Sequence, residues 1–190
     1  MLKLNTTQEI RIVQKILQTD SFIDAGSSRA VFSLSKTKVV KIAIDKEGIQ
    51  QNLNEIKTFD VFGDDKLARI YAYGEYIIVM ERVEHGFDSE DLEYCDEDYD
   101  LTEDDIEEIY KIAGFLDSKI GETIDNQQIG FSVERQKWVC YDYGLNLKDH
   151  CVSECVSTGL DYYLYKNGTN SVPNLILKNL ATKLDIIAKI

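Results

Sequence analysis

The sequence predicts an α+β protein, and three features of its 190 residues support this class. Apolar residues spaced three or four positions apart, typical of helices, alternate along the chain with short β-rich runs. Turn-forming segments separate consecutive β-rich runs, which indicates hairpins. The hydrophobic share of 44% and the charged share of 29% are typical of a globular protein rather than a disordered one.

The first half of the chain is expected to alternate between helices and hairpins. Helical periodicity predicts a first helix near residues 7–18, capped by Thr6, and a second helix over residues 47–62. Alternating and β-rich runs predict a hairpin over residues 29–44 and a pair of strands over residues 70–83.

An acidic block divides the two halves of the chain. From Glu84 to Tyr110 there are fourteen Asp or Glu residues and no Lys or Arg, whereas the other residues hold 20 acids and 21 bases. The block therefore accounts for the net charge of −13. Its first part is predicted to be a loop, and Thr102 is predicted to cap the helix that follows. A hairpin over residues 130–141 and a last helix after Pro173 complete the expected elements.

Composition excludes several classes of function. The net charge of −13 argues against unaided binding to nucleic acid or to anionic lipid. No apolar run approaches the roughly 20 residues that span a bilayer, and the first residues lack the apolar segment of a secretory signal. Four cysteines at irregular spacing do not form the framework of a disulfide-rich secreted protein. We therefore expect a cytoplasmic protein with reduced thiols.

Two features of the first hairpin point to a binding site. Gly26, Ser27, Ser28 and Arg29 lie before its first strand, where small residues let backbone N–H groups approach phosphate oxygens, although such a run also fits a simple turn. Lys41 lies at the centre of an apolar strand, where burial is costly unless an anion pairs with it. Glu55, on the next helix, is the expected partner; the alternative is an edge-strand lysine that faces solvent.

These segments resemble the small lobe of the protein-kinase-like fold, above all the compact kinase-like proteins of phages and bacteria. The resemblance is carried by Gly26 to Phe32, Val39 to Ala43, Asn54-Glu55 and Tyr76 to Glu81, in the family's order. It implies that the glycine loop and Lys41 hold the phosphates of ATP and that Glu55 pairs with Lys41. It also implies that the segment from Val79 to Val83, which includes Glu81, holds the adenine.

The resemblance extends to a metal site and to a two-lobed architecture. Asp142-Tyr143-Gly144 looks like the D-F-G-type motif of the family, which implies that Asp142 binds Mg²⁺. The expected domains are a β-rich N-lobe over residues 1–83, an acidic connector over residues 84–101 and a shortened, mainly helical C-lobe over residues 102–190.

The catalytic loop departs from the family pattern. Alignment on residues 129–130 puts Thr123 at the position of the base and Gln128 at the second metal position. A threonine cannot accept the substrate proton as a carboxylate does, and glutamine is a weaker metal ligand. Asp125 lies nearby and becomes the candidate base if the loop shifts by two residues.

Three functions remain open from the sequence. The first is a pseudokinase that binds ATP and regulates or inhibits a protein partner, which for a phage protein would be a host protein. The second is an active ATP-dependent Ser/Thr protein kinase in which Asp125 acts as the base. The third is an acidic protein that mimics the phosphate charge of DNA and binds a basic or DNA-binding protein.

Overall fold

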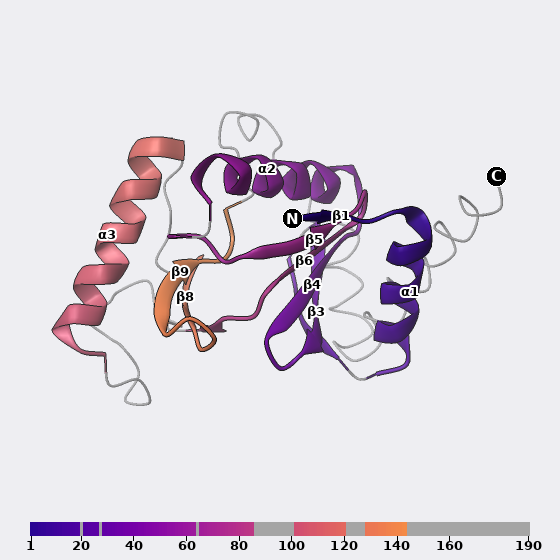
Figure 1. Cartoon of the computed structure of the whole chain (residues 1–190), viewed down its shortest axis with the longest axis horizontal. Helices are drawn as coiled ribbons and strands as arrows, with labels where there is room; N and C mark the ends of the chain where they lie inside the picture. Colours follow the sequence, from indigo (N-terminus) through magenta and orange to yellow (C-terminus); the bar gives the residue numbers. More distant parts are fainter. Residues whose placement is uncertain (20, 27, 64, 86–100, 121–127, 144–190) are drawn as a thin grey trace, which may run out of the picture.

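The structure, a computed structural model, describes residues 1–19, 21–26, 28–63, 65–85, 101–120 and 128–143. Within these residues the chain is an α+β protein with a six-stranded mixed sheet, a three-stranded sheet and three helices (Figure 1). The predictions for Ser27, Thr123 and Asp125, for residues 86–100 of the acidic connector and for the last helix fall outside the described residues.

The six-stranded sheet contains both predicted strand pairs of the first half. Its order is β1-β5-β6-β4-β3-β2, and only β1 runs parallel to its neighbour. The strands are β1 (Leu2–Lys3), β2 (Phe22–Ala25), β3 (Arg29–Ser35), β4 (Lys38–Ala43), β5 (Ile70–Tyr73) and β6 (Ile77–Glu81). The antiparallel pairs β3–β4 and β5–β6 confirm the sequence prediction, whereas β1 and β2 were not predicted.

The three-stranded sheet contains the predicted second hairpin. It has the order β7-β8-β9 and comprises β7 (Glu84–His85), β8 (Ile129–Ser132) and β9 (Lys137–Cys140). Helix α3 (Glu103–Ile120) packs against β9. Backbone hydrogen bonds from Ala68 N–H to Cys140 O at 2.7 Å and from Cys140 N–H to Lys66 O at 2.9 Å attach β9 to the segment before β5.

Both helices of the first half begin at side chains that accept backbone hydrogen bonds. Helix α1 (Thr6–Leu17) is capped by Asn5, whose side chain accepts from Gln8 N–H while the Gln8 side chain accepts from Asn5 N–H. The prediction of Thr6 as the cap was therefore wrong by one residue, because Asn5 and Gln8 form the capping box instead. Helix α2 (Lys46–Phe62) begins at Asp45, which accepts from Gly48 N–H at 2.9 Å.

The two faces of the six-stranded sheet carry separate hydrophobic cores. Successive side chains of a strand point to opposite faces, and along β6 Ile78 and Met80 belong to one core while Ile77 and Val79 belong to the other. Helix α1 covers the second face, whereas α2 contributes Ile56 to the first, so the helices lie on opposite sides of the sheet. The site described below lies on the α2 face.

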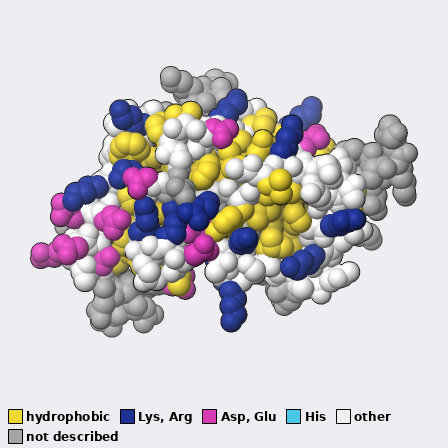
Figure 2. Space-filling model, viewed as in Figure 1, with side chains coloured by type: hydrophobic (Ala, Val, Ile, Leu, Met, Phe, Trp, Pro, Cys, Tyr) yellow, Lys and Arg dark blue, Asp and Glu magenta, His cyan; other side chains and the backbone are white. Residues whose placement is uncertain are grey.

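Charge is distributed unevenly over the face of the molecule that Figure 2 shows. Asp and Glu side chains gather over α3, and hydrophobic side chains are visible over the six-stranded sheet (Figure 2). Among the described residues, no helix combines the length and the apolar character that crossing a membrane requires.

Candidate functional site

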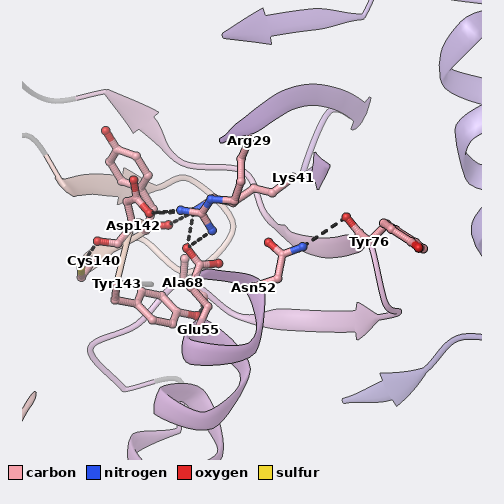
Figure 3. Close-up of polar contacts among 10 residues, drawn as sticks. Arg29, Lys41, Asn52, Glu55, Ala68, Tyr76, Cys140, Asp142 and Tyr143 are labelled. Atoms are coloured by element: carbon pink, nitrogen blue, oxygen red, sulfur yellow. Dashed lines mark hydrogen bonds and ion pairs between the residues drawn. The ribbon is translucent and has the colours of Figure 1, made fainter. Parts of the chain in front are cut away.

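Four charged side chains from four separate segments meet beside the six-stranded sheet (Figure 3). Arg29 begins β3, Lys41 lies on β4, Glu55 on α2, and Asp142 follows β9. Glu55 Oε1 accepts from Lys41 Nζ at 2.7 Å and from Arg29 Nη1 at 2.8 Å. Asp142 Oδ1 accepts from Arg29 Nη2 at 2.6 Å and from Lys41 Nζ at 3.3 Å. Two cations and two carboxylates thus form one ion-pair cluster.

A close approach of α2 to the loop before β3 brings Glu55 within reach of the sheet. Ile44 N–H donates to Ser28 O at 2.9 Å, and Ser28 Oγ donates to the Asp45 carboxylate at 3.4 Å. A Cβ atom on Gly48 would lie 2.1 Å from Ser28 O, so only glycine permits this contact. The start of α2 is thereby held against the loop before β3.

Asp142 is positioned by its two neighbours in the sequence. Tyr141 N–H donates to Gln128 O at 2.8 Å, and Tyr141 O accepts from Lys41 Nζ at 2.8 Å. The Tyr143 side chain is buried, and its hydroxyl donates to Ala68 O at 2.9 Å (Figure 3). With residues on both sides fixed, the Asp142 carboxylate points at the cluster while 35% of its side chain stays exposed.

The cluster forms part of the wall of a cavity of about 600 Å³, within the range of about 300–1,000 Å³ that is usual for small-molecule sites. The cavity is lined by Ile23, Asp24, Gly26, Ser28, Arg29, Val31, Val39, Lys41, Gln51, Met80, Glu81, Arg82, Val83, Glu84, Tyr141 and Asp142. Strand register explains its apolar part. Val31 lies opposite Lys41 on the neighbouring strand. Val39 lies two residues before Lys41 and opposite Met80. The side chains of these four residues therefore lie on the same face of the sheet.

Mutual charge compensation holds the cluster ionised. Burial acts to raise the pKa of the Asp142 carboxyl, but the charges of Lys41 and Arg29 outweigh it and hold that pKa well below its usual range. Burial acts to lower the pKa of the Arg29 guanidinium, and the Glu55 and Asp142 carboxylates reverse this effect. By contrast, burial raises the pKa of the Cys140 thiol, which therefore is not a reactive thiolate.

Glu81 lines the cavity, but its carboxylate binds elsewhere. Its oxygens accept from Arg69 N–H at 3.0 Å, from Arg135 Nε at 2.9 Å and from the Ser132 hydroxyl. Arg135 Nη2 also lies 2.6 Å from Glu81 Oε2 and donates to Leu67 O at 3.0 Å. The Glu81 side chain thus joins the end of β6 to the β8–β9 hairpin and is not available to a ligand.

The structure brings together most of the sequence-predicted site and leaves one described residue outside it. Gly26, Ser28, Arg29, Lys41, Glu81 and Asp142 all line the cavity, and Glu55 lies directly behind it. Gln128 directly precedes β8 in the sequence, is half-buried and is not among the residues that line the cavity. The backbone of Gln128 holds Tyr141 instead.

The two cations beside Asp142 make its carboxylate a poor ligand for Mg²⁺. Mg²⁺ is held by oxygen ligands in near-octahedral geometry, and proteins supply one or two carboxylates with free oxygens. Asp142 Oδ1 already binds two cations, Gln128 does not reach the cavity, and no group of three His, Cys, Asp or Glu able to hold a metal occurs in the described part of the chain. A divalent ion at Asp142 would also be repelled by Arg29 and Lys41.

Sequence reasoning missed several residues of the cavity wall. Gln51 lies one turn before Glu55 on α2, and the spacing of four residues places both side chains on one helix face. The pairing of Val31 and Met80 with β4 depends on strand register. Gln51 could therefore have been predicted from the expected position of Glu55 on its helix. The apolar wall could be identified only from the register of β3, β4 and β6.

No protein-family model matches the chain, and no curated protein matches it significantly.

Proposed function

We propose that this protein is a kinase-like ATP-binding protein that regulates a protein partner, as a pseudokinase does, with the cavity beside β3, β4 and β6 as its nucleotide site. A two-lobed architecture, with a small β-rich N-lobe and a shortened helical C-lobe, is part of the proposal. The hairpin, helix and second strand pair of the described fold occur in the order that such an N-lobe requires.

The observation that carries the proposal is the convergence of Lys41, Glu55 and Asp142 at one cavity. These residues are far apart in the sequence, yet Lys41 Nζ lies 2.7 Å from Glu55 Oε1 and 3.3 Å from Asp142 Oδ1. A buried lysine that is paired with a helix glutamate and opens onto a cavity offers a positive charge to phosphate groups. The apolar wall beside it suits a planar base.

The cavity combines the two kinds of surface that a nucleotide needs. Its charged end holds Arg29 and Lys41, and its apolar part includes Val31, Val39 and Met80. Pockets that hold small molecules commonly pair an apolar lining with a few placed polar groups. Phosphoryl transfer is not part of the proposal, because Thr123 replaces the expected base in the aligned sequence.

Regulation through a protein partner is proposed from the charge of the chain. The fourteen carboxylates from Glu84 to Tyr110 are compensated by no Lys or Arg within that block. A basic or DNA-binding protein would relieve their mutual repulsion, and such binding weakens steeply with salt. Amide substitution of Asp96, Glu97 and Asp98 should then weaken capture of a basic host protein at low salt.

Thermal unfolding with Mg-ATP tests the nucleotide site. Ligand at about 100 times its dissociation constant stabilises a protein by about 2.7 kcal/mol, which raises the melting temperature measurably. We expect millimolar Mg-ATP to raise the melting temperature of the wild-type protein and to leave that of Lys41→Met unchanged. The matched control is Lys36→Met, because Lys36 is exposed in the turn between β3 and β4.

The comparison between the two lysine variants decides the outcome. The control should respond to Mg-ATP as the wild-type protein does, since Lys36 lies away from the cavity. An equal rise in Lys41→Met, or no rise in the wild-type protein, would contradict the proposed nucleotide site.

A further inference from the structure

The charges of the cluster balance without a metal ion. Glu55 is fully buried, and the Arg29 and Lys41 side chains are 8% and 7% exposed. Together with Asp142 they amount to two positive and two negative charges, joined by four contacts of 2.6–3.3 Å. If Lys41 were the only cation, the two carboxylates would leave one negative charge for an added cation to neutralise. Arg29 supplies that charge from within the chain.

Arg29 is also the cation that has N–H donors left after its contacts with the described residues. A lysine ammonium has three N–H donors, and Lys41 directs them at Glu55, at the Tyr141 carbonyl and at Asp142. A guanidinium has five donors, of which Arg29 uses one for Glu55 and one for Asp142 within the described residues. Because the Arg29 side chain lines the cavity, its remaining N–H groups can donate to an anionic ligand bound there.

Arg29 contacts the Asp142 carboxylate at the edge of the cavity, where a metal ion bound to that carboxylate would lie, although it carries one positive charge rather than two. A divalent cation in such a site would bind the Asp142 carboxylate on one side and phosphate oxygens on the other. Arg29 Nη2 lies 2.6 Å from Asp142 Oδ1, and the Arg29 side chain is part of the cavity wall. Guanidinium groups bind phosphate oxygens in a fixed fork geometry, which suits this bridging position.

We propose that Arg29 takes the place of the divalent cation, so that the cavity binds nucleoside polyphosphates without Mg²⁺. In this arrangement the phosphate oxygens accept hydrogen bonds from the Arg29 guanidinium, which Glu55 and Asp142 hold in place. The inference rests on the proposed nucleotide site and adds its metal independence, a property that the resemblance to kinases does not imply.

Titration of the wild-type protein with ATP, by calorimetry in excess EDTA and again in MgCl₂, tests the inference. We expect dissociation constants that differ by less than about threefold, which is under 1 kcal/mol of binding energy. Binding that is about threefold or more tighter in MgCl₂ would overturn the inference while leaving the nucleotide site in place. ATP binding in neither buffer would instead refute the proposed function itself.

An Arg29→Gln variant tests the role of the side chain, with Arg11→Gln as the matched control because Arg11 is exposed on α1. In EDTA we expect Arg29→Gln to bind ATP at least about tenfold more weakly than the wild-type protein, and MgCl₂ should recover part of the loss because Arg29 then no longer pairs with Asp142. The control should bind as the wild-type protein does. Wild-type affinity of Arg29→Gln in EDTA would overturn the inference, and a circular dichroism spectrum confirms that the variant is folded.

Discussion

Replacement of Glu55 by glutamine should destabilise the fold more than its small change in shape implies. Glu55 Oε1 accepts from both Lys41 and Arg29, and Glu55 is fully buried. The other oxygen, Oε2, makes no hydrogen bond with the residues that the structure describes. The amide group can therefore occupy the side of Oε2 while the carbonyl oxygen keeps both acceptor contacts. The variant removes the charge and little else.

The size of the effect follows from the charge that is left uncompensated. In Glu55→Gln, two buried cations share the single carboxylate of Asp142, and removal of one partner from a buried ion pair costs about 3–5 kcal/mol. A domain of this size has a total stability of about 5–15 kcal/mol. With an m-value of about 2 kcal/mol/M, the urea midpoint should fall by about 1.5–2.5 M.

Urea unfolding followed by circular dichroism measures this shift, and Glu107→Gln is its control. Glu107 pairs with Lys111 one turn along α3 at 2.5 Å, and both side chains are about two-thirds exposed, at 64% and 65%. The same substitution should therefore leave the midpoint almost unchanged, because exposed ion pairs contribute little. If Glu55→Gln shifts the midpoint no more than the control does, the cluster does not stabilise the fold as described.

Three further predictions concern individual side chains. The lowered pKa of Asp142 means that its ion pairs stabilise the fold above about pH 4 and that this contribution is lost as the pH falls through the lowered pKa; Asp142→Asn should flatten the acid side of the stability–pH curve. Burial raises the pKa of Glu9, which favours its protonated form in the folded state. The stability that protonation contributes is present at acid pH and lost as the pH rises through the raised pKa. Glu9→Gln, which keeps an acceptor for Tyr76 N–H, should therefore melt higher than wild type at pH 7 and lose this advantage near pH 4. Tyr143→Phe leaves the buried Ala68 carbonyl without its donor and should lower the free energy of unfolding by about 1–2 kcal/mol, measured in urea.

Local patterns predicted most of the described fold. The helix expected near residues 7–18 spans Thr6–Leu17, and the one expected over residues 47–62 spans Lys46–Phe62. The hairpins were recognisable because alternation and a turn lie within a few residues of each other. Strand β1 gave no such signal, because it has two residues and pairs with β5 far along the chain. Strand β2 contains an irregularity in its register with β3, which interrupts the alternation.

The sequence was sufficient to predict the ion pair between Lys41 and Glu55, but not the contacts of Arg29 with the two carboxylates. An apolar strand with one central lysine predicts a buried anion, and Glu55 on the following helix meets that expectation. Arg29 was expected beside the phosphate loop, but its contacts with both carboxylates depend on how closely α2 approaches that loop. Gly48 permits this approach. A tertiary contact of this kind leaves no periodic pattern in the sequence.

Photolabelling with an azido derivative of ATP tests the proposed nucleotide site most directly, because it identifies the part of the chain that contacts the bound base. We expect the labelled peptide to come from the segment Met80–Glu84 or from the segment Ile23–Val31, both of which contribute residues to the cavity. Excess ATP should prevent the labelling, and Lys41→Met should reduce it. A labelled peptide that contributes no residue to the cavity would contradict the proposed nucleotide site.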